Sequence, residues 1–375
     1  MILVAQIKLL PSLDQKQILK QTMLKTNEAA CRVSDFAFEQ EMYKRFDLHH
    51  ALYNTLRVET GLTAQIVALL FAKVADAYRL DKKVKRVFRP LGAITYDSRV
   101  LTYYLEKGYV TIWTLTGRQK IPFTCGAYQK ELLKGLRGET DLVLVEGEFY
   151  LMAGCSIEDP PLRCVNGSIG VDLGIVNIAS DSEGNQYSGE PIRKVRRAMR
   201  RLRAGLQQCG SKSAKRHLQR LRRRQSRFTR WVNHNISKKI VETAVNLGKA
   251  LSLECLTGIR ERGNGFSREM RFELGNWSFD QLKQFVTYKA RRAGIPLVLI
   301  DPRNTSRTCS FCGYCAQHNR KSQSVFKCKN CGLEMNADRN AAVNISGHGA
   351  FVTRPMDGMM GNLSLLSKPP ALAGG

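Results

Sequence analysis

The spacing of apolar and polar residues changes twice along the chain. Residues 13–45 and 62–80 carry apolar positions three and four apart, which predicts two amphipathic helical regions. Residues 94–157 instead carry short runs of β-branched and aromatic residues punctuated by glycines, and a similar run at 2–10 stops at Pro11. This pattern predicts a small β-barrel with a helical insertion near its start.

The pattern changes again after the Pro-containing stretch 158–161, which is typical of a linker. Short apolar strands now alternate with helical segments, as they do in an α/β domain. The expected strands are 169–173, 175–179, 251–253 and 297–300, and the expected helices are 279–292 and 337–345. The residues from Thr353 onwards are rich in Gly, Pro and Ser, so we expect a disordered tail.

Composition adds a strong positive charge to this picture. The chain has 59 Lys and Arg against 32 Asp and Glu, a formal net charge of +27. Such an excess repels itself unless a polyanion neutralises it, and nucleic acid is the most direct partner. An anionic membrane surface is the alternative, but no apolar run is long enough to span a bilayer. With no secretory signal after Met1, we expect a cytoplasmic, nucleoid-associated protein that binds no membrane.

The basic residues gather in two places. Residues 193–239 contain eighteen Lys and Arg and no Asp or Glu, and we predict helices there that contact phosphates. For the aromatic residues Phe228 and Trp231 we favour packing against the sheet over stacking on bases. A shorter basic group follows the second helical region. The candidate nucleic-acid contacts are Arg222, Arg223 and Arg224 in the long segment and Lys82, Lys83, Lys85 and Arg86 in the short one.

Three carboxylates lie at positions that the hydrophobic pattern places in or next to a folded core. Asp172 lies in the apolar run Ile-Gly-Val-Asp-Leu-Gly, Glu254 ends the strand-like Leu-Ser-Leu-Glu, and Asp338 begins the last helix. Each has an ordinary interpretation: a sheet-edge residue capped by backbone N–H groups, an exposed strand end, and a helix N-terminal residue, respectively. Burying a carboxylate is otherwise expensive unless a cation compensates it.

The order of these acids favours a common site. One lies on the first strand of the α/β region, one on a later strand and one on the final helix, which is how an RNase-H-like sheet brings three acids to one point. Two neighbouring divalent cations need several carboxylate oxygens, and such a pair hydrolyses phosphodiesters by activating a water and stabilising the leaving oxygen. Asp172, Glu254 and Asp338 are therefore candidate catalytic residues and ligands of two Mg²⁺ ions, with Mn²⁺ as the alternative.

Four of the eleven cysteines form two Cys-x-x-Cys-Gly units. Cys309 and Cys312 make the first unit, and Cys328 and Cys331 make the second, with fifteen residues between the two. This spacing predicts one Zn²⁺ held by four thiolates in a zinc ribbon, a closed and therefore structural site. Cys315 does not fit the pairing.

Taken together, these motifs resemble the TnpB (OrfB) family, transposon-encoded RNA-guided DNA endonucleases related to the type V CRISPR effectors. The resemblance rests on the run around Asp172, on Leu-Glu-Cys-Leu-Thr-Gly-Ile-Arg around Glu254, and on Asn-Ala-Asp-Arg-Asn-Ala-Ala around Asp338. The sequence Thr-Ser-Arg-Thr-Cys that leads into the ribbon adds to it. The specific motifs lie within residues 165–350, and a looser likeness extends to the N-terminus.

The resemblance implies a fold and a set of domains. The fold would be an α/β, RNase-H-like (RuvC) nuclease core with an inserted zinc ribbon, preceded by a small β-barrel (wedge) with an inserted helical recognition domain. The implied boundaries are 1–10 and 88–165 for the wedge, 11–87 for the recognition insertion, 166–304 and 333–352 for the nuclease core, 305–332 for the ribbon and 353–375 for the tail.

An activity and its partners are implied as well. The expected protein binds a transposon-end guide RNA (ωRNA), recognises double-stranded DNA beside a short motif, and cuts both strands with one RuvC site. Three alternatives stay open: an RNA-guided binder that represses without cutting, a structure-specific nuclease that needs no guide, and a transposase. The presence of all three acids argues against the first, and the N-terminal half has no explanation under the second.

Overall fold

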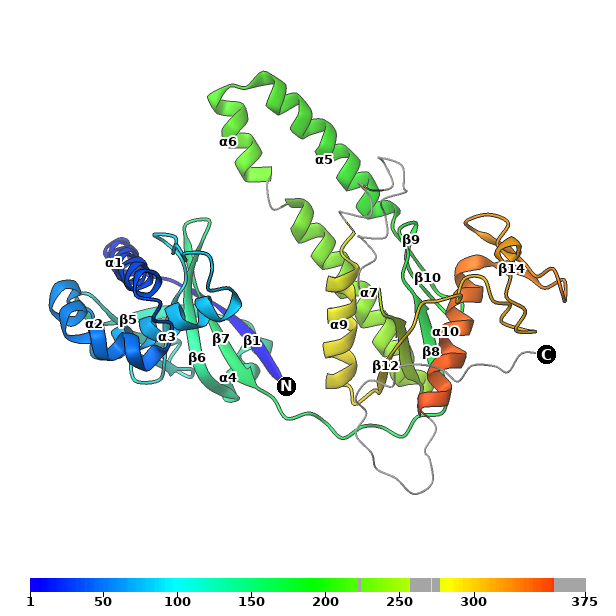
Figure 1. Cartoon of the computed structure of the whole chain (residues 1–375), viewed down its shortest axis with the longest axis horizontal. Helices are drawn as coiled ribbons and strands as arrows, with labels where there is room; N and C mark the ends of the chain where they lie inside the picture. The colour runs from blue at the N-terminus through cyan, green and yellow to red at the C-terminus, as the bar shows by residue number, and fades with distance from the viewer. Residues whose placement is uncertain (222–223, 257–270, 272–276, 354–375) are drawn as a thin grey trace. The chain divides into compact units, whose positions relative to one another are not determined.

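Two compact units make up the chain, Met1–Glu158 and Asp159–Gly375 (Figure 1). The structure, a computed structural model, describes residues 1–221, 224–256, 271 and 277–353. The expected tail lies outside the described residues from position 354 onwards. Among the helices that are described, none has the length and apolar character needed to span a bilayer.

The first unit is built on a seven-stranded antiparallel sheet in the order β2-β6-β7-β1-β5-β4-β3. The strands are β1 Ile2–Leu9, β2 Ile94–Tyr96, β3 Leu101–Tyr104, β4 Tyr109–Thr114, β5 Gly117–Thr124, β6 Leu136–Val145 and β7 Glu148–Ser156. The two edge strands, β2 and β3, follow one another in the chain, and the sheet forms a nearly closed barrel. Alternate residues of β4 and β7 are buried, as the two-residue period of a strand requires. The predicted barrel is thereby confirmed.

Four helices complete the first unit. They are α1 Leu13–Glu39, α2 Arg45–Thr60 and α3 Ala64–Leu80, all between β1 and β2, and α4 Ala127–Lys134 between β5 and β6. The helical region expected over residues 13–45 extends too far, because α1 ends at Glu39 and Glu41 adopts a φ of 50°. No helix was predicted for α2, which buries only Leu48, Leu56 and Thr60 and so has little apolar periodicity.

The second unit contains a five-stranded sheet in the order β10-β9-β8-β11-β12. Its strands are β8 Ser168–Asp172, β9 Asn177–Asp181, β10 Gln186–Ser188, β11 Ala250–Glu254 and β12 Leu297–Ile300. Strands β8, β9 and β10 form an antiparallel meander, and β11 and β12 run parallel to β8. The strand expected at 175–179 begins two residues later in the structure, and β10 is too short for a sequence pattern to indicate.

Helices cover both faces of this sheet (Figure 1). The helices that the structure describes in this unit are α5 Glu190–Cys209, α6 Lys212–Leu221, α7 Arg224–Leu247, α9 Phe279–Arg292 and α10 Ala337–Thr353. The odd-numbered positions of β8 and β11, such as Val171 and Leu253, form one core with apolar residues of α7 and α9. The intervening positions face α10, because side chains alternate along a strand. The described parts of the basic segment are helical, as predicted.

Helix α10 lies in direct contact with the sheet because glycines replace side chains at the crossing. A Cβ on Gly170 of β8 would lie 2.0 Å from the Ala342 carbonyl oxygen and 2.4 Å from the Ser346 nitrogen. On the helix, a Cβ at Gly349 would lie 1.7 Å from the Ser252 Oγ of β11. No larger residue fits at these two positions unless the helix moves away.

A small cysteine-containing subdomain precedes α10. It contains the 3₁₀ turn η2 Gln317–Asn319 and a two-stranded hairpin of β13 Val325–Lys327 and β14 Glu334–Asn336. Strand β14 runs directly into α10, so the subdomain and the start of that helix are one continuous piece of chain.

Replacing Gly170 by Ala should destabilise the protein by about 2–3 kcal/mol, because the new methyl group meets backbone atoms of α10 that cannot rotate away. Gly205→Ala is the matched control, since a Cβ there meets nothing within 4 Å and Ala favours the helix. Thermal unfolding followed by circular dichroism measures both. An unchanged melting temperature for G170A would show that α10 does not rest on β8 as described.

Candidate functional site

The three candidate acids lie at the ends of their elements. Asp172 is the last residue of β8 and Glu254 the last residue of β11. These strands are parallel neighbours, and Leu253 pairs with Val171. The next residue on each strand is one of the two acids, so the acids lie side by side at the same edge of the sheet. Asp338 is the second residue of α10, the helix that crosses these strands. The structure therefore brings together three residues that are far apart in the sequence.

The surroundings exclude the ordinary interpretation of two of the acids, Glu254 and Asp338. Glu254 is only 7% exposed, so it is not a solvated strand end. Asp338 is not the cap of α10, because the Asn336 Oδ1 accepts hydrogen bonds from the backbone nitrogens of Asp338 at 3.0 Å and Arg339 at 3.1 Å. The Asp338 carboxylate is thus free of the capping role that its position suggests.

Asp172 is the acid that feels the charges of the other two. Burial, followed by the charges of Glu254 and Asp338, raises the pKa of Asp172 to about 8, and the Arg320 guanidinium opposes this shift. Burial also raises the pKa of Glu254. A cluster in which burial and like charge both disfavour the ionised form calls for a compensating cation.

Three polar side chains orient the carboxylates, and the sequence analysis assigned a role to none of them. The Thr305 Oγ1 donates a hydrogen bond of 2.6 Å to the Glu254 Oε1. The Asn177 Nδ2 donates one of 3.0 Å to the Asp338 Oδ2, and the Arg320 guanidinium lies 3.8 Å from the other oxygen of Asp338. Thr305 lies in a motif already noted, but Asn177 and Arg320 are single residues that no spacing singles out.

The four predicted cysteine ligands form a compact cluster. The Sγ atoms of Cys309, Cys312, Cys328 and Cys331 lie within 4.8 Å of one another. The Cys309–Cys331 and Cys312–Cys328 sulfur distances are 3.7 and 3.6 Å. A tetrahedral zinc with Zn–S bonds of about 2.3 Å needs sulfurs about 3.8 Å apart, so the geometry fits. A hydrogen bond with the Tyr314 backbone lowers the pKa of Cys312 to about 6, which favours the thiolate.

Asparagines of α10 tie this cluster to the acid site. The Asn340 side chain accepts from the Ser310 nitrogen at 3.0 Å and donates to the Thr308 carbonyl at 2.8 Å. The Asn344 side chain donates to the carbonyls of Thr305 and Thr308, each at 2.8 Å. The segment from Thr305, which hydrogen-bonds to Glu254, to Cys309 is therefore hydrogen-bonded to α10, the helix that carries Asp338.

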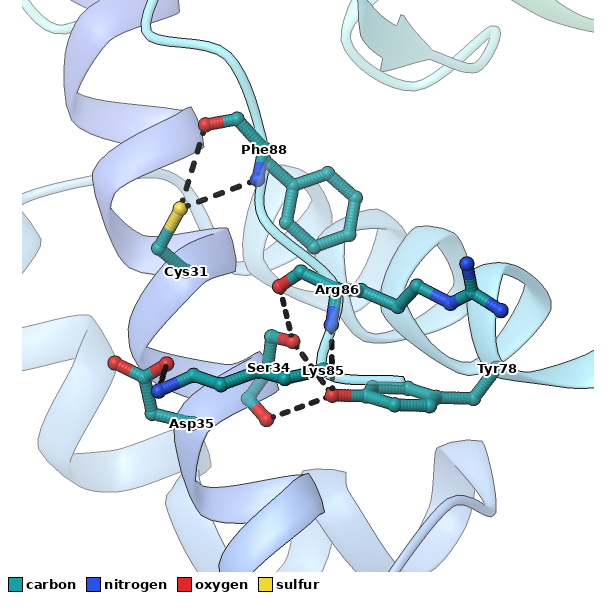
Figure 2. A network of polar contacts seen from close by, with 7 residues as sticks. All are labelled: Cys31, Ser34, Asp35, Tyr78, Lys85, Arg86 and Phe88. Carbon is teal, nitrogen blue, oxygen red and sulfur yellow. Dashed lines mark hydrogen bonds and ion pairs between the residues drawn. The ribbon is translucent and has the colours of Figure 1, made fainter. Parts of the chain in front are cut away.

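Much of the short basic group in the first unit is already engaged within the chain (Figure 2). Lys85 pairs with Asp35 at 2.7 Å, and the backbone of Arg86 is held by the Ser34 and Tyr78 hydroxyls. The Arg86 guanidinium donates to the Asp81 carbonyl at 2.6 Å, and the Lys82 ammonium lies over the Tyr43 ring. Lys82 and Lys83 are exposed.

The long basic segment is only partly described, and its aromatic residues differ from expectation. Arg224 is exposed at the start of α7, while Arg222 and Arg223 lie outside the described residues. Phe228 packs against the core of the second unit, as expected. Trp231 does not, because it is 62% exposed. The preference for packing was wrong for Trp231, since a basic helix that projects from the sheet has an open face at this position.

Family comparisons match two stretches of the chain, which lie almost wholly in the second unit. Residues 154–248 match the OrfB family, described as "Probable transposase", and residues 279–345 match the family described as "Cas12f1-like, TNB domain". The CRISPR-associated endodeoxyribonuclease Cas12f1 of Sulfoacidibacillus thermotolerans is 42% identical over 130 residues, 34% of this chain and 29% of that protein. The chain is similar in sequence to TnpB-like and Cas12f proteins. A TnpB-like protein of Methanocaldococcus jannaschii is 35% identical over 112 residues, 30% of this chain and 40% of that protein.

A solved structure extends the TnpB and Cas12f likeness to the fold. A cryo-EM structure of a Cas12f1–sgRNA–target DNA complex matches with a TM-score of 0.61 at 15% identity, over 89% of this chain and 83% of that chain. The chain spans less than half of the length of the curated relatives that it matches first. The resemblance to the TnpB family inferred from the motifs is confirmed.

The purified protein should contain one zinc per chain, and Cys309→Ser should lose it, because three thiolates leave the tetrahedral site open. Elemental analysis of both proteins measures this. Cys315→Ser is the matched control, since this exposed cysteine stands three residues after Cys312 and should leave the metal content unchanged. A zinc-free wild type, or loss of zinc in the control, would contradict the assignment.

Proposed function

We propose that this protein is an RNA-guided endonuclease that cuts double-stranded DNA with a single RNase-H-like (RuvC-type) site. The observation that carries the proposal is the meeting of Asp172, Glu254 and Asp338, from two strands and a helix, on the α10 side of one sheet. The names of the relatives support it: one is an endodeoxyribonuclease, and the solved Cas12f1 chain is bound to a guide RNA and target DNA.

The strand order supports the RNase-H-like assignment. An antiparallel meander of three strands is followed by two strands parallel to its first strand, β8. The acids stand at the end of the first strand, at the end of the fourth and at the start of the last helix. Carboxyl ends of parallel strands are where sites of α/β folds form.

The acid cluster fits a pair of Mg²⁺ ions, with Mn²⁺ as the alternative. Carboxylate oxygens are the ligands that these hard cations prefer, and the pKa of Asp172 is raised first by burial and then by the charges of Glu254 and Asp338, which a cation would offset. When bound, the pair would activate the attacking water and stabilise the leaving oxygen of the phosphodiester.

Neighbouring side chains hold the carboxylates in place for this chemistry. Thr305 fixes one oxygen of Glu254, and Asn177 fixes one oxygen of Asp338. Arg320 places positive charge beside Asp338. Partners of this kind set the orientation and basicity of metal ligands. The cysteine cluster, holding one Zn²⁺, would act structurally by bracing the start of α10.

Guide RNA, for which a transposon-end ωRNA is the candidate, and target DNA would bind through the basic surfaces. Helices α5, α6 and α7 carry most of the segment 193–239 and suit the phosphates of a guide–target duplex, which such proteins recognise by shape. A protein of this charge that binds DNA would associate with the nucleoid. Hydrolysis is favoured over repression because all three acids are present, and over strand joining because the motifs around these acids resemble TnpB.

The first unit would supply the wedge and recognition domains, divided as 1–10 with 88–165 and 11–87, and would recognise the motif beside the target. It would not take part in the chemistry, which belongs to the core at 166–304 and 333–352 with the ribbon at 305–332. Among its candidate contacts, Lys82 and Lys83 are better placed than Lys85 and Arg86, whose charges already have partners in the chain.

Replacing Asp172, Glu254 or Asp338 by Ala should each lower cleavage of guide-matched plasmid DNA more than about 100-fold. Removing a residue that hydrogen-bonds to a metal ligand typically lowers activity about 10–100-fold, and removing a metal ligand itself should lower it more. RNA binding should stay unchanged. Asp76→Asn is the control, because Asp76 lies in the first unit and pairs with Arg79 on its own helix at 3.0 Å. A D172A protein that cuts at the wild-type rate would refute the site, and joined strands instead of cut ends would favour a transposase.

Replacing Arg222, Arg223 and Arg224 together by Gln should weaken binding to every nucleic-acid sequence alike. The slope of log K against log[salt] should become shallower by the amount expected for the loss of up to about three phosphate contacts. Each such contact releases counterions when the nucleic acid binds. Lys25→Gln with Lys134→Gln is the control, since each lysine pairs with a glutamate on its own helix. A salt slope equal to that of the wild type would argue against direct phosphate contact.

A further inference from the structure

A large aromatic side chain on the basic helices is left in solvent. Trp231 of α7 is 62% exposed, whereas Trp277 is buried and Trp113 packs against the core of the first unit. Single exposed apolar residues are common on protein surfaces and need no explanation alone. The setting of Trp231 therefore decides what its exposure means.

That setting is cationic. Arg224, Arg227 and Arg230 are exposed on the preceding two turns of the same helix. Arg224 and Arg227 stand seven and four residues before Trp231, so they share its face of the helix. The whole stretch 193–239 contains no Asp or Glu to oppose them. Such a surface is complementary to a polyanion and repels a cationic partner.

The indole ring is also held in a defined orientation. The Phe228 ring, which packs against the core, lies 6.1 Å from the Trp231 ring between centroids, at an interplanar angle of 28°. A ring restrained in this way loses less conformational entropy when a partner stacks on it.

We propose that Trp231 is a stacking platform for an unpaired nucleobase, with the arginines around it contacting phosphates of the same strand. Aromatic platforms beside cations bind single strands with little sequence preference, since every base has a π-face. That property suits a protein whose sequence choice comes from a guide. The proposal rests on the proposed function only for nucleic-acid binding by these helices and needs no cleavage.

Tryptophan fluorescence of the full chain tests the contact directly. A single-stranded oligonucleotide should quench the emission of the wild type, and Trp231→Phe should remove that quenching while Trp113 and Trp277 still emit. An abasic strand of equal length supplies the same phosphates without bases and should not quench. Deoxyribose and ribose versions of the strand distinguish a DNA source from an RNA source. Equal quenching by the abasic strand, or quenching that survives in W231F, would overturn the proposal.

Affinity gives a second, independent measurement. Trp231→Ala should weaken binding of the single strand about 5- to 150-fold, and Trp231→Phe should weaken it less, because phenylalanine keeps a smaller π-face. The salt slope should not change, since no phosphate contact is lost. Leu247→Ala, at a half-exposed apolar residue on the last turn of α7, is the control and should bind normally. Wild-type affinity in W231A, or a lower salt slope, would contradict stacking even if DNA cleavage by the protein is established.

Discussion

The contact between α10 and strand β8 is the constraint on which the candidate site depends. Asp338 reaches Asp172 and Glu254 only because the helix rests on the sheet at Gly170, where a Cβ would lie 2.0 Å from a helix carbonyl oxygen. The strand residues on this side are therefore small or acidic, while the opposite side carries Val171 and Leu253 in the apolar core. Packing on both faces thus fixes where the acids stand.

The cysteine cluster helps to fix the position of the first turns of α10. Its hairpin continues into α10, and Asn340 and Asn344 hydrogen-bond to the segment that leads into the first cysteine. Thr305 of that segment also binds Glu254. A metal that stiffens the cluster would therefore position two of the three carboxylates without touching them.

The acids and the cysteines could be predicted from the sequence because both carry a local signal. A carboxylate inside an apolar run is unusual, and paired Cys-x-x-Cys units have few other uses. Asn177 and Arg320 could not be predicted, because their roles arise only when distant segments meet at Asp338. Helix α2 was missed because it buries few apolar residues. The exposure of Trp231 was missed because helical periodicity alone does not say whether anything covers a given face.

The central claim is that three acids, the buried Glu254 and the half-buried Asp172 and Asp338, form one site for divalent cations. Its most direct test is Mn²⁺ binding, counted by electron paramagnetic resonance in the full protein with guide RNA and uncleavable target DNA bound. The account predicts two Mn²⁺ ions per chain beyond the structural zinc, and fewer in Asp172→Asn, whose amide removes the negative charge but keeps the shape. The same Mn²⁺ count in the wild type and in D172N would contradict it.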